Sequence, residues 1–384
     1  MMRDYVYMDN AASSFPKPDS VSREVYRCLT EYSGNPGRSS HPISIQSAAK
    51  IYECREQISE LLNATPESVI FTHNATTAIN MVMKCAIGHG EHFIISNMEH
   101  NAVYRPAIAL NEQVGATFDT FDAFAPSEQL LRNIENKITP QTRAIVCTHA
   151  SNICPLVLPI EQLGELCRRR GIFFILDAAQ SAGREDICMK TQNVDALIMA
   201  GHKGLLAPMG VGVLVLSERL QQYLAARPTL IEGGSGIDSL GLKMPNFFPE
   251  RFEAGTPSLP AIAGLCEGVK FIRNITPQAI RESEDYHYRR MREILLNTRN
   301  VTLYKPEYTN GSVLLFNIDG MESEHTASLF AEHGVYLRAG LHCAPLAHER
   351  LGTLAHGAVR ASLGWATSSH DVETFARALT EIAK

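Results

Sequence analysis

Leu197-Ile198-Met199-Ala200-Gly201-His202-Lys203-Gly204 is the stretch of sequence that most directly predicts the fold. The apolar run from Val194 to Ala200 is typical of a buried β-strand, and Gly201 marks the turn that ends it. A lysine just after the end of such a strand lies where burial can lower its pKa and make it a nucleophile toward aldehydes. Taken alone the pattern is weak, because most lysines that follow strands are solvated loop residues.

A second strand with a charged end gives the lysine a partner. The apolar run from Ile172 to Leu176 ends in Asp177. A lysine that forms a Schiff base and an acid that partners the pyridinium nitrogen are the two protein groups that anchor pyridoxal phosphate. Lys203 and Asp177 at the ends of two strands therefore indicate a pyridoxal phosphate site.

Strands and helices alternate through the first two thirds of the chain. Apolar periodicity predicts strands over 69–72, 92–96, 116–121, 143–148, 172–177, 194–200 and 211–216, with helices near 45–62, 73–87, 102–114, 127–138 and 161–170. This order predicts an α/β fold on a mainly parallel seven-stranded sheet, in which ligands bind beyond the carboxyl ends of the strands. The polar residues just after predicted strand ends are Thr76, His100, Asn152, Asp177, Gln180 and Lys203.

Thr76 and Thr77 lie at the start of the predicted helix over 73–87. Their hydroxyls and the free backbone N–H groups of a helix start suit an anion. The alternative is an ordinary helix cap, which threonine also provides. The breaker-rich loop over 33–42 is open to two interpretations in the same way, as a surface connection or as the rim of a site.

The last third of the chain has a different pattern. We expect a large domain over 15–275 and a smaller α+β domain formed by 276–384 together with 1–14, with the boundary at the Thr276-Pro277 step. The elements expected there are helices over 260–272, 277–296, 324–333 and 369 onward, and strands over 311–319, 335–338 and 359–362.

Cys343 lies in a loop bounded by glycine and proline, beside basic and imidazole groups. Such surroundings lower the pKa of a thiol and expose it, although an inert cysteine is the more common case. The nearby histidines at 342, 348 and 356 also suggest a metal site, but their spacing matches no standard zinc pattern, and we predict no metal. Arg360, on the last predicted strand, suits a substrate carboxylate or a plain salt bridge.

Composition narrows the classes of protein. A net charge of −6 argues against nucleic acid and anionic membranes as partners. The sequence has no 18-residue apolar run, and its first residues lack the apolar region of a signal peptide. Nine cysteines without a C-x-x-C pair indicate reduced thiols, so we expect a cytoplasmic protein.

Together these motifs resemble one family. The chain is similar to the cysteine desulfurase and selenocysteine lyase group within the class V aminotransferases, which are pyridoxal phosphate enzymes of fold type I. The matching stretches, in order, are 7–12, 76–80, 98–101, 151–152, 176–180, 201–203, 251–257, 338–344 and 359–362. The surroundings of Cys343 resemble the second desulfurase group, which has the shorter catalytic loop.

The resemblance implies a set of cofactor contacts. Lys203 would carry the cofactor as a Schiff base, Asp177 would keep the pyridine nitrogen protonated, and His100 would stack on the ring. Gln180 would contact the phenolic oxygen, with Asn152 nearby. The residues implied for the phosphate are Thr76, Thr77, His202 and, from the neighbouring subunit of a homodimer, Thr256.

The resemblance also implies a reaction. Arg360, with Asn152, would bind the carboxylate of L-cysteine or L-selenocysteine, and Arg338 would flank a mobile loop. Cys343 would attack the sulfur or selenium, releasing alanine and passing the atom to an acceptor protein, for example in iron–sulfur cluster assembly. The alternatives are a selenocysteine lyase, another class V reaction such as aminotransfer or β-elimination, and a sulfur-trafficking scaffold with little turnover.

Two residues depart from the family pattern. Ala200 replaces the usual serine or threonine, so we expect one phosphate hydrogen bond, worth about 1.5–3 kcal/mol, to lack a donor there. Leu341 replaces a second histidine that this group often has, so no proton-transfer role is expected at that position.

Overall fold

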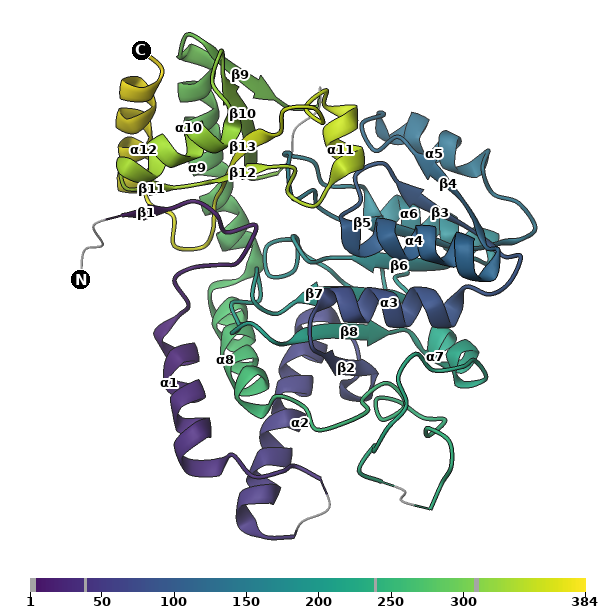
Figure 1. Cartoon of the computed structure of the whole chain (residues 1–384). Helices are drawn as coiled ribbons and strands as arrows, with labels where there is room; N and C mark the ends of the chain where they lie inside the picture. Colours follow the sequence, from purple (N-terminus) through teal and green to yellow (C-terminus); the bar gives the residue numbers. More distant parts are fainter. Residues whose placement is uncertain (1–4, 38–39, 238–239, 307–310) are drawn as a thin grey trace.

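A seven-stranded sheet forms the centre of the chain (Figure 1). The computed structural model describes residues 5–37, 40–237, 240–306 and 311–384. In spatial order the strands of the sheet are β2 (Val69–Thr72), β8 (Gly212–Leu216), β7 (Ala196–Ala200), β6 (Phe173–Asp177), β5 (Thr142–Thr148), β3 (His92–Ser96) and β4 (Thr117–Phe121). β8 runs antiparallel to both neighbours, and the remaining pairs are parallel. The predicted α/β fold with a mainly parallel sheet of seven strands is therefore confirmed.

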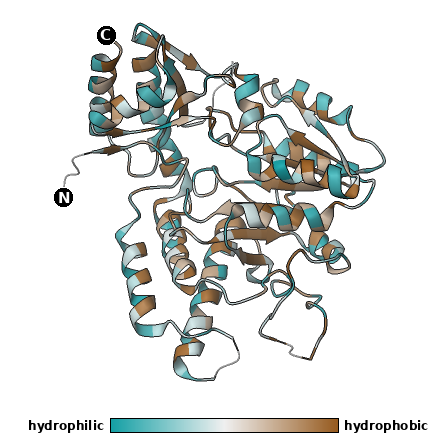
Figure 2. Cartoon of the chain, in the orientation of Figure 1, coloured by the Kyte–Doolittle hydropathy of each residue, from teal (hydrophilic) through white to brown (hydrophobic). Residues whose placement is uncertain are grey.

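The central strands are apolar throughout because both faces of the sheet are covered. Successive side chains of a strand point to opposite faces. In β6, Phe173 and Ile175 pack into one core, while Phe174 and Leu176 pack into another. Figure 2 shows these strands as a hydrophobic layer between helices of mixed character. Continuous apolar runs are the usual pattern of strands buried on both faces.

Helices from different parts of the chain cover the two faces. Buried residues of α2 (Pro42–Leu62), α5 (Ser127–Glu135), α6 (Ile160–Arg170) and α8 (Leu259–Ile275) belong to the core that contains Phe174 and Leu176. Buried residues of α3 (Ala75–Ala86), α4 (Asn101–Val114) and α7 (Glu218–Ala225) belong to the core that contains Phe173 and Ile175. Helix α1 (Asp19–Arg27), continued by the π-helix η1 (Cys28–Tyr32), packs on α8, and the 3-10 turn η2 (Pro66–Ser68) precedes β2.

A second, antiparallel sheet is built from the last third of the chain. Its order is β12 (Arg338–Gly340), β13 (Ala358–Ser362), β10 (Val313–Ile318) and β9 (Val301–Tyr304). The helices of this part are α9 (Pro277–Asn297), α10 (Ser323–Glu332), α11 (Pro345–Arg350) and α12 (Ser369–Ile382).

The beginning of the chain joins this second part. Strand β1 (Val6–Tyr7) pairs in parallel with β11 (Val335–Tyr336), and Val6 shares a core with Phe316 and Phe375 (Figure 1). Residues 1–4, which the expected small domain includes, lie outside the described residues. The domain boundaries themselves stay a prediction.

The structure differs from the sequence prediction in a few short elements. Helix α2 begins at Pro42 rather than near residue 45, because the Nδ1 atom of His41 accepts the Ser44 N–H at 3.3 Å and caps the helix. Helices α7 and α11 and strand β9 were not predicted. They are short, and their apolar positions are too few to give a clear period.

Of the helices in the described part of the chain, none is both long enough and apolar enough to cross a membrane.

Candidate functional site

A cavity of about 240 Å³ lies at the carboxyl edge of the large sheet. Its walls come from the loops after the parallel strands and from β12, β13 and the loop after β12. The residues predicted from sequence that line it are Thr76, His100, Asn152, Asp177, Gln180, His202, Lys203, Arg338, Cys343 and Arg360. The fold thus brings ten residues from distant parts of the sequence to one site.

Two predicted residues do not line this cavity. Thr77 and Thr256 line a second, smaller cavity of about 60 Å³. The backbone N–H of Thr77 is bonded to the side chain of Asn74, which caps α3 at 2.9 Å. Thr256 is exposed. Within one chain, therefore, Thr256 is separated from the group around Lys203.

Asp177 and Lys203 place opposite charges in the same cavity. Burial raises the pKa of the Asp177 carboxyl, although the N–H of Ala179, 2.9 Å from Oδ1, and the Lys203 ammonium oppose the shift. Burial lowers the pKa of Lys203 to about 8, with Asp177 opposing the shift and Arg360 adding to it. A buried carboxylate of this kind favours a cationic partner, and a lysine with this pKa is partly neutral at neutral pH.

His100 is held as a neutral ring. It caps α4, and its Nδ1 atom accepts the N–H of Ala102 at 3.0 Å. Burial lowers the pKa of His100 to about 4, and the positive charge of Lys203 adds to this shift. Because Nδ1 accepts, the proton of the neutral ring is on Nε2. Neutral His100 presents an aromatic ring to the cavity without a charge.

Arg360 is positioned by a residue that sequence analysis did not select. Its Nη2 atom donates to Oδ1 of Asp9 at 2.5 Å, and its Nη1 atom donates to the carbonyl of Asn152 at 3.0 Å. The buried Nε atom has no hydrogen-bond partner among the described residues. Asp9 lies in the stretch 7–12 that contributed to the family resemblance, but the sequence does not show that Asp9 pairs with Arg360. A guanidinium has five N–H donors, so donors remain for an anion in the cavity after these two contacts.

Cys343 follows β12 and is exposed at the cavity. Its carbonyl accepts the N–H of Asn101 at 2.7 Å, and the carbonyl of His342 accepts the side-chain N–H of Asn152 at 2.8 Å. Of the nine cysteines, Cys343 is the exposed one. The loop therefore presents one accessible thiol on the same cavity as Lys203.

The histidines near Cys343 make hydrogen-bond contacts with different groups. Nδ1 of His342 lies 3.2 Å from Nε2 of His348, a hydrogen-bond distance. His356 instead lies beside the hydroxyl of Tyr304, at 3.4 Å. A metal would need the free lone pairs of these rings to meet at one point.

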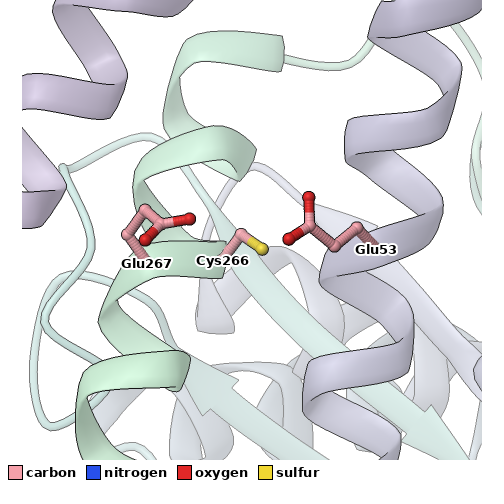
Figure 3. Close-up of side chains that lie close together, drawn as sticks. All are labelled: Glu53, Cys266 and Glu267. Atoms are coloured by element: carbon pink, nitrogen blue, oxygen red, sulfur yellow. The ribbon is translucent and has the colours of Figure 1, made fainter.

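A different group in the described part of the chain has ligand atoms within 4.8 Å of one another: Glu53, Cys266 and Glu267 (Figure 3). Lys50 forms ion pairs with both carboxylates, at 3.0 Å and 3.3 Å, and Lys270 also pairs with both. The two ammonium groups neutralise the carboxylates, so this cluster is best explained as an ionic contact between α2 and α8.

Comparisons with known proteins give consistent results. The sequence profile of the family described as Aminotransferase class-V matches residues 6–375. A protein of Pyrococcus abyssi named "Probable cysteine desulfurase" is 30% identical over all of this chain and 96% of its own length, and one of the same name from Methanothermobacter thermautotrophicus is 29% identical with the same coverage. A solved apo structure of a cysteine desulfurase from Thermococcus onnurineus NA1 superposes with a TM-score of 0.91, at 29% identity, over 99% of this chain and 95% of that one.

The lowered pKa of Lys203 leads to a prediction about the apoprotein. A lysine attacks an aldehyde as the neutral amine, so the rate of reaction with added pyridoxal phosphate should rise with pH and level off above about 8. A lysine with the ordinary pKa of about 10.4 would keep accelerating beyond that point. The rate is measured from the absorbance of the adduct, with Lys203→Ala as the control that forms none. A midpoint near pH 10 would contradict the assignment.

Proposed function

Because the chain belongs to the aminotransferase class V family, we propose that it is a pyridoxal phosphate-dependent cysteine desulfurase that converts L-cysteine to L-alanine. The observation that carries this proposal is the exposed thiol of Cys343 on the same cavity as Lys203, Asp177 and Arg360. An aminotransferase needs the lysine and the acid but has no use for a thiol there.

The residues of the cavity fit pyridoxal phosphate. Asp177 offers a buried carboxylate to a pyridinium nitrogen, and Lys203 offers an amine to the aldehyde. The Nδ1 atom of His202 is buried without a hydrogen-bond partner among the described residues, which suits a phosphate oxygen, as does Thr76 at the start of α3. Ala200 lines the same cavity and can donate no side-chain hydrogen bond, so the phosphate must rely on these other groups.

The remaining cofactor residues follow from the family resemblance. His100 would stack on the ring as a neutral imidazole. Gln180, whose Nε2 atom donates to the carbonyl of Ala11 at 2.9 Å, would lie beside the phenolic oxygen together with Asn152. Bound there, pyridoxal phosphate supplies the electron sink that weakens bonds at the α-carbon and β-carbon of an amino acid.

The protein's own groups then carry the reaction. Arg360 binds the substrate carboxylate with the N–H donors that Asp9 and Asn152 leave free, and Arg338, paired in register with Arg360, also lines the cavity and adds positive charge there. Lys203 takes the α-proton on its amine and returns protons to the product. The thiolate of Cys343 forms a bond to the substrate sulfur as the bond between Cβ and that sulfur breaks. The electron pair goes to Cβ, which is protonated to give alanine, and the persulfide remains on Cys343.

The persulfide must pass to a second molecule. Cys343 is exposed, so a protein acceptor or a small thiol can reach it. Leu341, two residues before it, is 40% exposed and can transfer no proton. All nine cysteines of the chain are free thiols, which agrees with our proposal of a reducing compartment such as the cytoplasm.

We also propose a homodimer with shared sites. Thr256 is exposed and does not line the cavity around Lys203 in its own chain, so it is accessible to a partner subunit. The loop before it exposes large apolar side chains, with Leu240 at 92% and Leu242 fully exposed. Exposed apolar residues grouped in one loop are typical of a protein interface.

The test of the proposed reaction is Cys343→Ala. We expect this variant to bind pyridoxal phosphate as the wild type does and to lose nearly all release of sulfide from L-cysteine, because the acceptor for sulfur is missing. Alanine and sulfide are measured separately, with Cys188→Ala, a half-buried cysteine outside the cavity, as the matched control. Wild-type rates of alanine formation by Cys343→Ala would overturn the role of Cys343, and release of sulfide with pyruvate and ammonia in place of alanine would move β-elimination ahead of the desulfurase reaction.

The shared site is tested by mixing two inactive variants. Thr256→Glu should repel the phosphate of the partner's cofactor, and Lys203→Ala removes the amine. An equal mixture that exchanges subunits should recover about a quarter of wild-type activity, since half of the dimers are mixed and each has one complete site. A mixture of Lys203→Ala with Lys203→Met should recover none. An active monomer in sedimentation experiments would overturn the proposal.

A further inference from the structure

The turn that presents Cys343 has an unfavourable backbone. His342 and Cys343 have φ angles of +49° and +56°, in the left-handed region that residues with a Cβ atom rarely adopt. Two such residues in succession persist only where surrounding contacts hold them. The backbone contacts of the turn to Asn101 and Asn152 supply part of that hold.

A chain of buried side chains supplies another part. Nε2 of His342 lies 3.3 Å from the carbonyl of Arg338, the first residue of strand β12. Nδ1 of His342 lies 3.2 Å from Nε2 of His348, and Nδ1 of His348 lies 2.7 Å from the hydroxyl of Thr353. His348 and Thr353 are fully buried, and His342 is 6% exposed. These hydrogen bonds therefore connect Thr353, just after α11, with β12, the strand that precedes the turn of Cys343.

One arrangement of protons satisfies every contact in this chain. The carbonyl of Arg338 can only accept, so the proton of neutral His342 must be on Nε2. Its Nδ1 atom then accepts from Nε2 of His348, which leaves Nδ1 of His348 to accept from the hydroxyl of Thr353. Burial lowers the pKa of His342 to about 3 and that of His348 to about 4, so both rings are neutral in this arrangement.

The reverse arrangement is unfavourable. The Thr353 hydroxyl also lies 3.4 Å from the carbonyl of His348, and if it donated there it would accept from Nδ1 of His348. Every proton along the chain would then be displaced, and a lone pair of His342 would face the carbonyl oxygen of Arg338. Two acceptors at 3.3 Å repel each other, so the Arg338 carbonyl favours the first arrangement, and the Thr353 hydroxyl stabilises it by donating to Nδ1 of His348.

We infer that His348 and Thr353 are positioning residues for Cys343: they stabilise the tautomer of His342 that bonds to the Arg338 carbonyl, and they thereby hold the turn that places the thiol on the cavity. This inference rests on the proposed function, because it assigns Cys343 the task of accepting sulfur. Neither residue lines the cavity, so both act through His342. A loosened turn would slow the attack on the substrate sulfur and leave the binding of L-cysteine by Arg360 unchanged.

The test compares substitutions that differ only in hydrogen bonding. Thr353→Val removes the hydroxyl at nearly constant volume, and Thr353→Ser keeps it. We expect Thr353→Val to lower kcat for alanine formation about tenfold, the effect of losing one or two buried hydrogen bonds, with KM unchanged. Thr353→Ser should stay within about twofold of the wild type. His348→Phe should behave like Thr353→Val, and His348→Gln, which keeps a donor near the position of Nε2, should recover part of the rate.

The position of the proton on His342 provides a second test, which can be made on the wild-type protein if a variant folds poorly. In wild-type protein labelled with ¹⁵N, nuclear magnetic resonance should find the proton of His342 on Nε2, and Thr353→Val should move it or leave it mixed. A wild-type proton on Nδ1 of His342 would overturn the inference, as would equal kcat losses in Thr353→Val and Thr353→Ser. Neither spectrum requires turnover, so a wild-type protein that forms no persulfide would contradict the proposed function alone.

Discussion

The carboxylate of Asp177 is the group on which the rest of the site depends. It ends a strand that is buried on both faces, and it is itself only 4% exposed. A buried carboxylate is costly unless a positive charge faces it. Lys203, just after the end of the neighbouring strand β7, supplies part of this positive charge. The register of β6 with β7 fixes the two strands relative to each other. The same burial that penalises the charge of Asp177 also makes Lys203 easier to deprotonate.

The N-terminal segment joins the two halves of the site. Asp9 pairs with Arg360 on β13, the carbonyl of Ala11 accepts from Gln180 after β6, and the N–H of Ser14 donates to the carbonyl of His202 at 3.0 Å. These contacts tie Arg360, the proposed group for the substrate carboxylate, to the residues around Lys203 that would hold the cofactor. A segment of a few residues thus helps to set the position of Arg360 relative to Lys203.

The sequence was sufficient to predict the parallel sheet and most of the cavity. Strands buried on both faces give long apolar runs, and a polar residue directly after such a run lies at the carboxyl edge, so Asp177 and Lys203 were identifiable without a structure. Asp9, His348 and Thr353 were not identified as positioning groups. Their roles depend on pairing with Arg360 and His342, partners distant in sequence or set by a turn with positive φ, which local patterns do not encode. Thr256 shows a related limit, since its proposed role lies in a second copy of the chain.

The central claim is that sulfur from L-cysteine is carried by Cys343. The most direct measurement is the mass of the peptide that contains Cys343, after the protein loaded with pyridoxal phosphate has been incubated with L-cysteine without reductant and its thiols have been alkylated. The account predicts that this peptide gains one sulfur atom while the peptides containing the other eight cysteines do not. Alanine formed in stoichiometric amounts with no added sulfur on Cys343, or with the sulfur on another cysteine, would contradict it.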